Sequence, residues 1–106
     1  MVHWSVPPGF AVADEPSVLD AGLVGRDVYM RWEAVGWQLG KITGVITEST
    51  PRLFKSGFNY RIVWADKHKG PAKLAVSKYA YGAHAAYNSW VILDCASFEL
   101  ASEHLI

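Results

Sequence analysis

Four aromatic residues stand where neighbouring strands of a sheet would begin or end. Trp32 and Trp37 flank a short connection, and Tyr60 and Trp64 share one parity of a later apolar run. Large rings combine an apolar body with a polar edge, which is why they are enriched at binding surfaces. The same rings also serve to fill a core and its mouth. The sequence leaves both interpretations open.

A basic segment lies between two acidic ends of the chain. Residues 41–78 hold six Lys and two Arg against two acids, whereas residues 1–40 hold two Arg against five acids. A basic surface with interleaved rings can follow a phosphate backbone while the rings stack on bases. The competing interpretation is that the acidic ends fold over the basic segment and neutralise it. The candidate nucleic-acid contacts are Lys41, Lys55, Arg61, Lys67, His68, Lys69 and Lys73.

No motif in the chain has the spacing of a catalytic or metal site. The four histidines are scattered, and the single cysteine, Cys95, follows an apolar run. Phosphate-binding glycine loops, nucleophile elbows and zinc-binding His-Glu-x-x-His sequences are missing. Without a cluster of ligand-forming residues we expect no metal and no cofactor. We therefore predict a protein that is not an enzyme.

Length and composition indicate one globular domain. The chain has 106 residues, of which 51% are hydrophobic and 19% charged, so it can build a core without staples. One cysteine cannot form an intrachain disulfide, which favours a reducing compartment. No apolar run reaches the roughly 18 residues of a membrane span, and the N-terminus lacks the features of a signal peptide. We expect an intracellular protein with no membrane partner.

The rings must be positioned by short strands. Residues 23–32 alternate between apolar and polar, with Val28, Met30 and Trp32 on one face. The next four residues form a hairpin connection that ends at Gly36, where the backbone would need a positive φ. This alternation predicts a half-buried first strand.

The second strand, residues 37–47, cannot keep one phase of alternation. Gly40 and Gly44 lie within the phase change, and glycine inside a strand often marks a bulge or sharp bend. The later segments are predicted as a polar loop over 48–57, strands over 58–64, 72–79 and 90–94, a basic turn over 66–71, and one helical turn within 79–88. In the fourth strand Leu74 and Val76 are expected to face inward.

Five short strands, a bent second strand and a helical turn before the last strand are typical of an SH3-like barrel. Within these elements the chain reads Gly25-x-x-Val28, Trp32, Gly36-Trp37-x-x-Gly40-x-Ile42, Tyr60-x-Ile62-Val63-Trp64-Ala65-Asp66, Leu74 and Trp90-x-x-Leu93. This pattern resembles the Tudor and chromo-barrel domains of chromatin readers. We therefore expect an all-β fold, with an N-terminal arm over 1–22 that packs on a five-stranded SH3-like (Tudor-like) barrel over 23–94. A short C-terminal helix is expected over 95–106.

The resemblance implies an aromatic cage for a methylated lysine or arginine, held by cation–π attraction. By position, Trp32 and Trp64 match two cage sites, and Trp37 or Leu39 falls near a third, depending on how the second strand is aligned. The candidate ligand-binding residues of this aromatic edge are Trp32, Trp37, Tyr60 and Trp64. Lys67 and Lys69 depart from the family pattern, because two ammonium groups at the rim would repel a cationic ligand. Plain packing of the rings therefore stays open as the alternative.

Three hypotheses on function follow from these patterns. The first is a non-catalytic, nuclear binding module that recognises a peptide, such as a methylated histone-like tail, at the aromatic edge. The second is nucleic-acid binding through residues 41–78. The third is a structural or oligomerisation domain of a larger protein.

Overall fold

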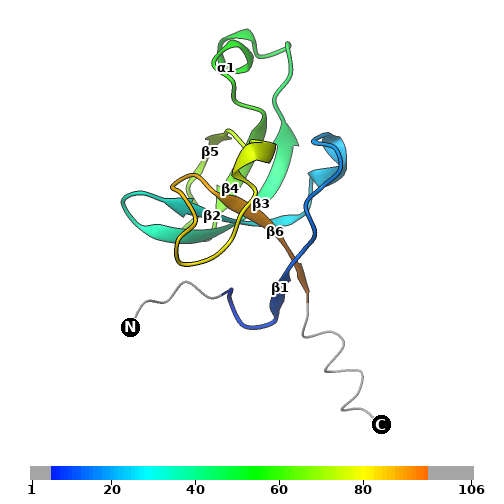
Figure 1. Cartoon of the computed structure of the whole chain (residues 1–106). Coiled ribbons are helices and arrows are strands. Elements are labelled where there is room, and N and C mark those ends of the chain that lie inside the picture. Colours follow the sequence, from blue (N-terminus) through cyan, green and yellow to red (C-terminus); the bar gives the residue numbers. More distant parts are fainter. Residues whose placement is uncertain (1–5, 96–106) are drawn as a thin grey trace.

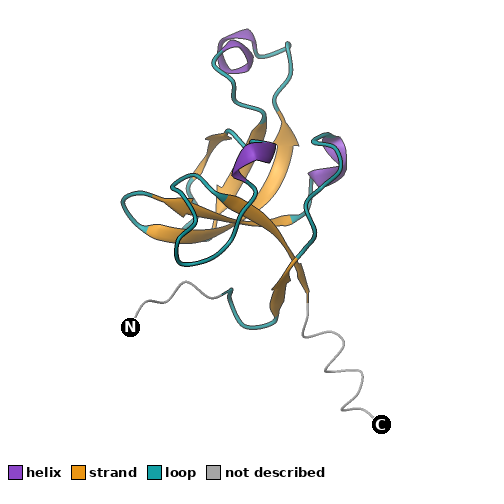
Figure 2. Ribbon diagram, viewed as in Figure 1, coloured by secondary structure: helices purple, strands orange, loops and turns teal. Residues whose placement is uncertain are grey.

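Strands dominate residues 6–95, the part of the chain that this computed structural model describes (Figure 1). The fold is all-β, as predicted, with one antiparallel sheet in the order β1-β6-β2-β3-β4-β5. The strands are β1 (Phe10–Val12), β2 (Asp27–Trp32), β3 (Gly36–Val45), β4 (Tyr60–Trp64), β5 (Lys69–Ala72) and β6 (Trp90–Cys95). The short helices, drawn purple in Figure 2, are η1 (Ala21–Leu23), α1 (Pro51–Lys55) and η2 (Val76–Lys78).

The sheet has six strands where the sequence predicted five. The extra strand is β1, whose residue Phe10 lies opposite Cys95 and whose residue Val12 lies opposite Leu93 of β6. Strands β1 and β5 are the two edges of the sheet, and they are not paired with each other within residues 6–95. The structure therefore has an open sheet, whereas the predicted barrel would require hydrogen bonds that close the sheet. The predicted C-terminal helix lies outside the described residues, except for its first residue, Cys95, which belongs to β6.

The first hairpin forms where the sequence predicted it. Gly36 has a φ of +81°, which is accessible to glycine without steric cost. It pairs with Trp32, so the connection contains three residues, 33–35. This register places Trp37 opposite Arg31.

The predicted irregularity of the second strand is present in β3. The pairing of β3 with β4 changes register between Ile42 and Gly44, which is a β-bulge. A bulge bends its strand and increases the local twist. Strand β3 can therefore pair with β2 along one part and with β4 along the other.

Three local predictions between β3 and β6 are wrong. The loop over 48–57 contains α1, which begins with Pro51, a residue suited to the first turn of a helix. The fourth strand starts earlier than predicted and ends at Ala72, so Leu74 is buried but Val76 is 49% exposed. The helical turn before the last strand is η2, and residues 79–88 contain no helix.

Apolar side chains cover both faces of the sheet. One face carries an inner cluster built around Val28, Ile42, Ile62, Leu74 and Trp90, all less than 2% exposed. The other face carries an outer cluster of Tyr29, Val91 and Leu93, against which residues of the N-terminal segment and Tyr81 pack. Because β6 is covered on both faces, its sequence is a continuous apolar run instead of an alternating one.

Candidate functional site

The rings of Trp32 and Trp64 meet at the ends of β2 and β4. Their centroids are 5.3 Å apart and their planes are inclined by 78°, an edge-to-face contact. Both side chains are partly buried against the inner cluster. They line an open pocket of about 330 Å³ together with Val35, Gln38, Asp66 and His68. We call it the tryptophan pocket.

Gly40 makes the position of the Trp64 ring possible. It lies in regular register between Val28 of β2 and Trp64 of β4, outside the bulge. A Cβ atom at Gly40 would lie 2.6 Å from Cε3 of Trp64 and 2.7 Å from Cγ2 of Ile62. These distances are too short for any side chain, so the ring can lie across the strand only because this residue is glycine.

The turn after β4 places a carboxylate beside the two rings. The Trp64 amide donates to the His68 carbonyl at 2.8 Å, and the Lys67 amide donates to the Trp64 carbonyl at 2.8 Å. Asp66 Oδ1 accepts a hydrogen bond from the His68 amide at 3.0 Å, and Asp66 Oδ2 lies 2.9 Å from His68 Nδ1. Hydrogen bonds from the side chain and backbone of His68 lower the pKa of Asp66 below its ordinary value. The carboxylate is therefore ionised at neutral pH.

Two aromatic rings and a carboxylate form an environment suited to a cation. The faces of Trp rings attract ammonium and guanidinium groups, with Trp the strongest of the aromatic residues. The carboxylate adds a direct charge–charge attraction. Lys67 and Lys69, which the sequence pattern placed at the rim, are not among the residues that line this pocket.

The other two predicted aromatic positions lie elsewhere. Trp37 stacks on Tyr29, with centroids 5.3 Å apart, and contacts Tyr81 at 5.0 Å in the outer cluster. Tyr60 is 1% exposed in the inner cluster, and its hydroxyl donates to the Asp20 carbonyl at 2.8 Å. The structure thus brings two of the four predicted rings to the tryptophan pocket, whereas Tyr60 is buried in the inner cluster beneath them and Trp37 packs in the outer cluster.

The predicted basic contacts are spread over several parts of the molecule. Three of them share the outward face of the sheet: Lys41 lies opposite Val63, Val63 lies opposite Lys69, and Arg61 is two residues from Val63. Lys41 also pairs with Asp27, at 3.4 Å. The remaining four lie in α1, in the turn after β4 and after β5: Lys55, Lys67, His68 and Lys73.

Sequence reasoning missed three residues of the tryptophan pocket: Val35, Gln38 and Asp66. Asp66 had a local signal, since an Asp two residues before His68 commonly accepts a hydrogen bond from that backbone amide. Val35 and Gln38 had none, because only the folded hairpin brings them to the ends of β2 and β4.

Neither a metal cluster nor a membrane-spanning helix is found in residues 6–95. No group of three or more His, Cys, Asp or Glu residues in this range is arranged to hold a metal ion. No helix in the same range is long and apolar enough to cross a bilayer. Comparisons with known proteins found no family model, no curated protein and no solved structure that matches the chain.

Proposed function

We propose that this protein is a non-catalytic binding module that takes a methylated lysine or arginine side chain of a peptide into the tryptophan pocket. The observation that carries the proposal is the edge-to-face contact of Trp32 and Trp64 beside the ionised Asp66. Methylation spreads the charge of an ammonium group and weakens its hydration. A methylated cation therefore gains more from aromatic faces than an unmodified lysine, which must give up tightly bound water.

An SH3-like, Tudor-like architecture is part of the same proposal. It is supported by the path of the chain: β2 to β5 are consecutive neighbours, η2 follows, and β6 returns to lie beside β2. The inner cluster draws residues from all five of these strands, so the sheet curls around one core. A nuclear location and a histone-like tail as the peptide also belong to this proposal.

The test is a titration of ¹⁵N-labelled protein with matched peptides that carry trimethyllysine, unmodified lysine or an uncharged isostere of trimethyllysine. We expect the trimethyllysine peptide to shift the indole N–H signals of Trp32 and Trp64 and to bind about tenfold more tightly than the other two. Equal binding of the uncharged isostere would contradict a cation site.

Two variants test the contributions of the carboxylate and of the ring while keeping most of the local contacts. Asp66→Asn keeps an oxygen that can accept the His68 amide but removes the charge, and Trp64→Leu keeps apolar packing but removes the ring. Each should weaken trimethyllysine binding severalfold or more. Glu33→Gln, which removes an exposed charge from the neighbouring hairpin connection, is the matched control and should leave binding unchanged.

A second candidate function, nucleic-acid binding, is favoured by the outward face that carries Lys41, Arg61 and Lys69. All three side chains belong to exposed residues. If this face binds single-stranded nucleic acid, the affinity should fall steeply as the salt concentration rises, because phosphate contacts release counterions. Arg61→Glu with Lys69→Glu should abolish that binding and leave the methylated peptide unaffected.

A further inference from the structure

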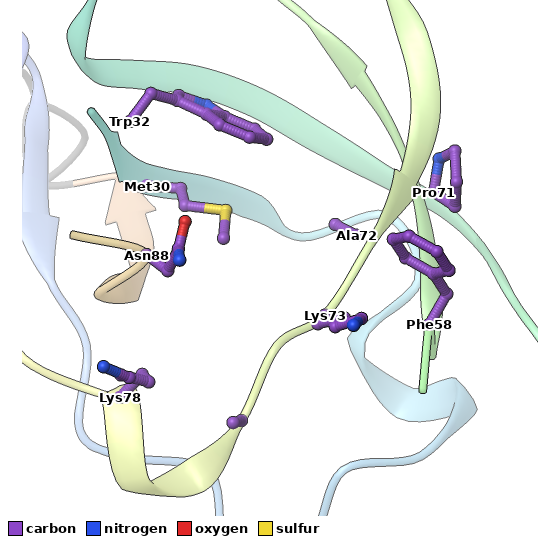
Figure 3. Close-up of a pocket in the computed structure, with 9 residues that line it drawn as sticks. Met30, Trp32, Phe58, Pro71, Ala72, Lys73, Lys78 and Asn88 are labelled. Atoms are coloured by element: carbon purple, nitrogen blue, oxygen red, sulfur yellow. The ribbon is translucent and has the colours of Figure 1, made fainter. Parts of the chain in front are cut away.

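A second pocket, of about 380 Å³, also has Trp32 in its lining. Figure 3 shows its lining, with Trp32 and Met30 facing Phe58 and Pro71 across the opening. Met30 and Ala72, which are 3% exposed, form part of its base. Its wall is therefore mostly apolar, and its size is at the lower end for sites that bind small ligands or single side chains.

The polar side chains that line this pocket carry positive charge or none. They are Lys73, Lys78 and Asn88, and no Asp or Glu lines the pocket. The ammonium group of Lys73 lies 5.1 Å from the centre of the Phe58 ring. Within residues 6–95 neither lysine lies within ion-pair distance of a carboxylate, and the basic side chains that do are Arg26, Lys41 and His68. We call this site the lysine pocket.

The backbone between Lys73 and Lys78 is anchored by specific contacts of the chain between β5 and η2. The side-chain amide of Asn59 donates to the Leu74 carbonyl at 2.9 Å and accepts from the Leu74 amide at 2.9 Å. The Trp90 indole donates to the Ala75 carbonyl at 2.7 Å. Lys73 precedes this anchored stretch and Lys78 follows it, so the backbone holds both on the same pocket.

We propose that the lysine pocket binds an aromatic or branched aliphatic group that carries a carboxylate. The apolar group lies against Met30, Trp32 and Phe58, and the carboxylate accepts charge-assisted hydrogen bonds from Lys73 and Lys78. A neutral apolar group would leave the two ammonium groups without an anion. A small anion alone would leave the apolar wall exposed to water.

This chemistry has two sources: a free organic acid, or the C-terminal residue of a peptide with an apolar side chain. The charge preference is opposite to that of the tryptophan pocket, although both pockets share Trp32. The inference therefore does not rest on the proposed binding of a methylated cation. Asp66→Asn, which disables the tryptophan pocket, should leave the lysine pocket unchanged.

The test uses ¹⁵N-labelled protein and two pairs of probes: 3-phenylpropionate with 3-phenylpropanamide, and N-acetyl-phenylalanine with its amide. We expect a carboxylate to shift the amide signals of Lys73, Lys78 and Asn88 and the indole signal of Trp32. Its neutral amide should bind about tenfold more weakly, because it cannot accept charge-assisted hydrogen bonds as a carboxylate does. Tighter binding of N-acetyl-phenylalanine supports a peptide C-terminus, and tighter binding of 3-phenylpropionate supports a free acid.

Variants then locate the site. Lys73→Gln combined with Lys78→Gln should reduce carboxylate binding to the level of the amide, whereas Lys55→Gln, on α1, should have no effect. Ala75→Trp places a large side chain at an exposed position of the lining without altering the core. It should block binding of the carboxylate and of the amide in both pairs of probes. Equal binding of acid and amide, or carboxylate binding that survives the double lysine substitution, would overturn the proposal.

Discussion

At the scale of single residues, Gly40 determines how closely the Trp64 ring can lie against β3. Its missing side chain leaves space for the Trp64 ring and for Ile62, because a Cβ atom here would lie 2.6 Å from Cε3 of Trp64 and 2.7 Å from Cγ2 of Ile62. Gly44, four residues along the same strand, has no such neighbour, because the nearest atom to its Cβ position is Arg61 Cδ at 3.9 Å. Two glycines that look equivalent in the sequence therefore have different roles.

Gly40→Ala should displace the Trp64 ring and lower the free energy of unfolding by about 1–3 kcal/mol, the usual cost of overpacking. Urea denaturation measures the loss, and the indole N–H signal of Trp64 reports the displacement. Gly44→Ala is the matched control and should change both measurements little. An unmoved Trp64 signal in Gly40→Ala would show that the strand shifts instead and that the ring does not depend on this glycine.

At the scale of elements, the stretch between β5 and η2 behaves as part of the sheet although it is not a strand. The amide side chain of Asn59 makes the two hydrogen bonds to Leu74 that a neighbouring strand would otherwise make. The backbone of Asn59 adds a third, from its amide to the Ala72 carbonyl at 3.0 Å. A side chain thus extends the pairing of β4 and β5 beyond the end of β5.

Asn59→Ala should leave the amide and carbonyl of the buried Leu74 without partners and cost about 1–3 kcal/mol of stability. Hydrogen exchange should show faster exchange of the Leu74 amide than in the unaltered protein. Ser77→Ala, at an exposed position in η2, is the control and should change neither quantity measurably. If Leu74 kept its protection in Asn59→Ala, the anchoring role assigned to this side chain would be wrong.

At the scale of the whole molecule, tyrosines connect the sheet to the segments that cover it. Tyr79 donates to the Ala13 carbonyl at 2.6 Å and accepts from the Ile92 amide at 3.1 Å, which joins the N-terminal segment to β6. Tyr60 joins η1 to the inner cluster through Asp20. Burial is the main reason that the pKa of each of these tyrosines is raised above its ordinary value of 10.0.

These shifts predict how stability depends on alkaline pH. The unfolded chain loses tyrosine protons near pH 10, whereas the folded protein retains them to higher pH, so the stabilisation is complete below pH 10 and is lost as the pH rises further. Urea denaturation at pH 8, 10 and 11 should show this decline. Tyr60→Phe should reduce the slope and cost about 1 kcal/mol at pH 8, because it removes one hydrogen bond. Tyr87→Phe, at a position 48% exposed, is the control for the loss of stability at pH 8, and an unchanged slope in Tyr60→Phe would refute the assignment.

Local patterns were sufficient to predict most of the strands. Val28 and Met30 alternate with polar neighbours, Gly36 must adopt a positive φ, and the phase change in β3 marks a bulge. Each of these depends on a few adjacent residues, so it is visible in one sequence. The end of β5 was not predictable in this way, because Leu74 is held by the side chain of Asn59, fifteen residues earlier.

The sequence by itself determined that the chain forms antiparallel strands with aromatic residues at their ends. Only the tertiary structure decided which rings meet. A four-residue connection would have placed Trp37 opposite Trp32, on the same face, but the three-residue connection places it opposite Arg31 on the other face. The physical reason is that side chains alternate along a strand with a period of two, so a difference of one residue in register moves a ring through the sheet. The ring of Trp64, which contacts Trp32, has room beside β3 because its partner residue on that strand, Gly40, has no side chain.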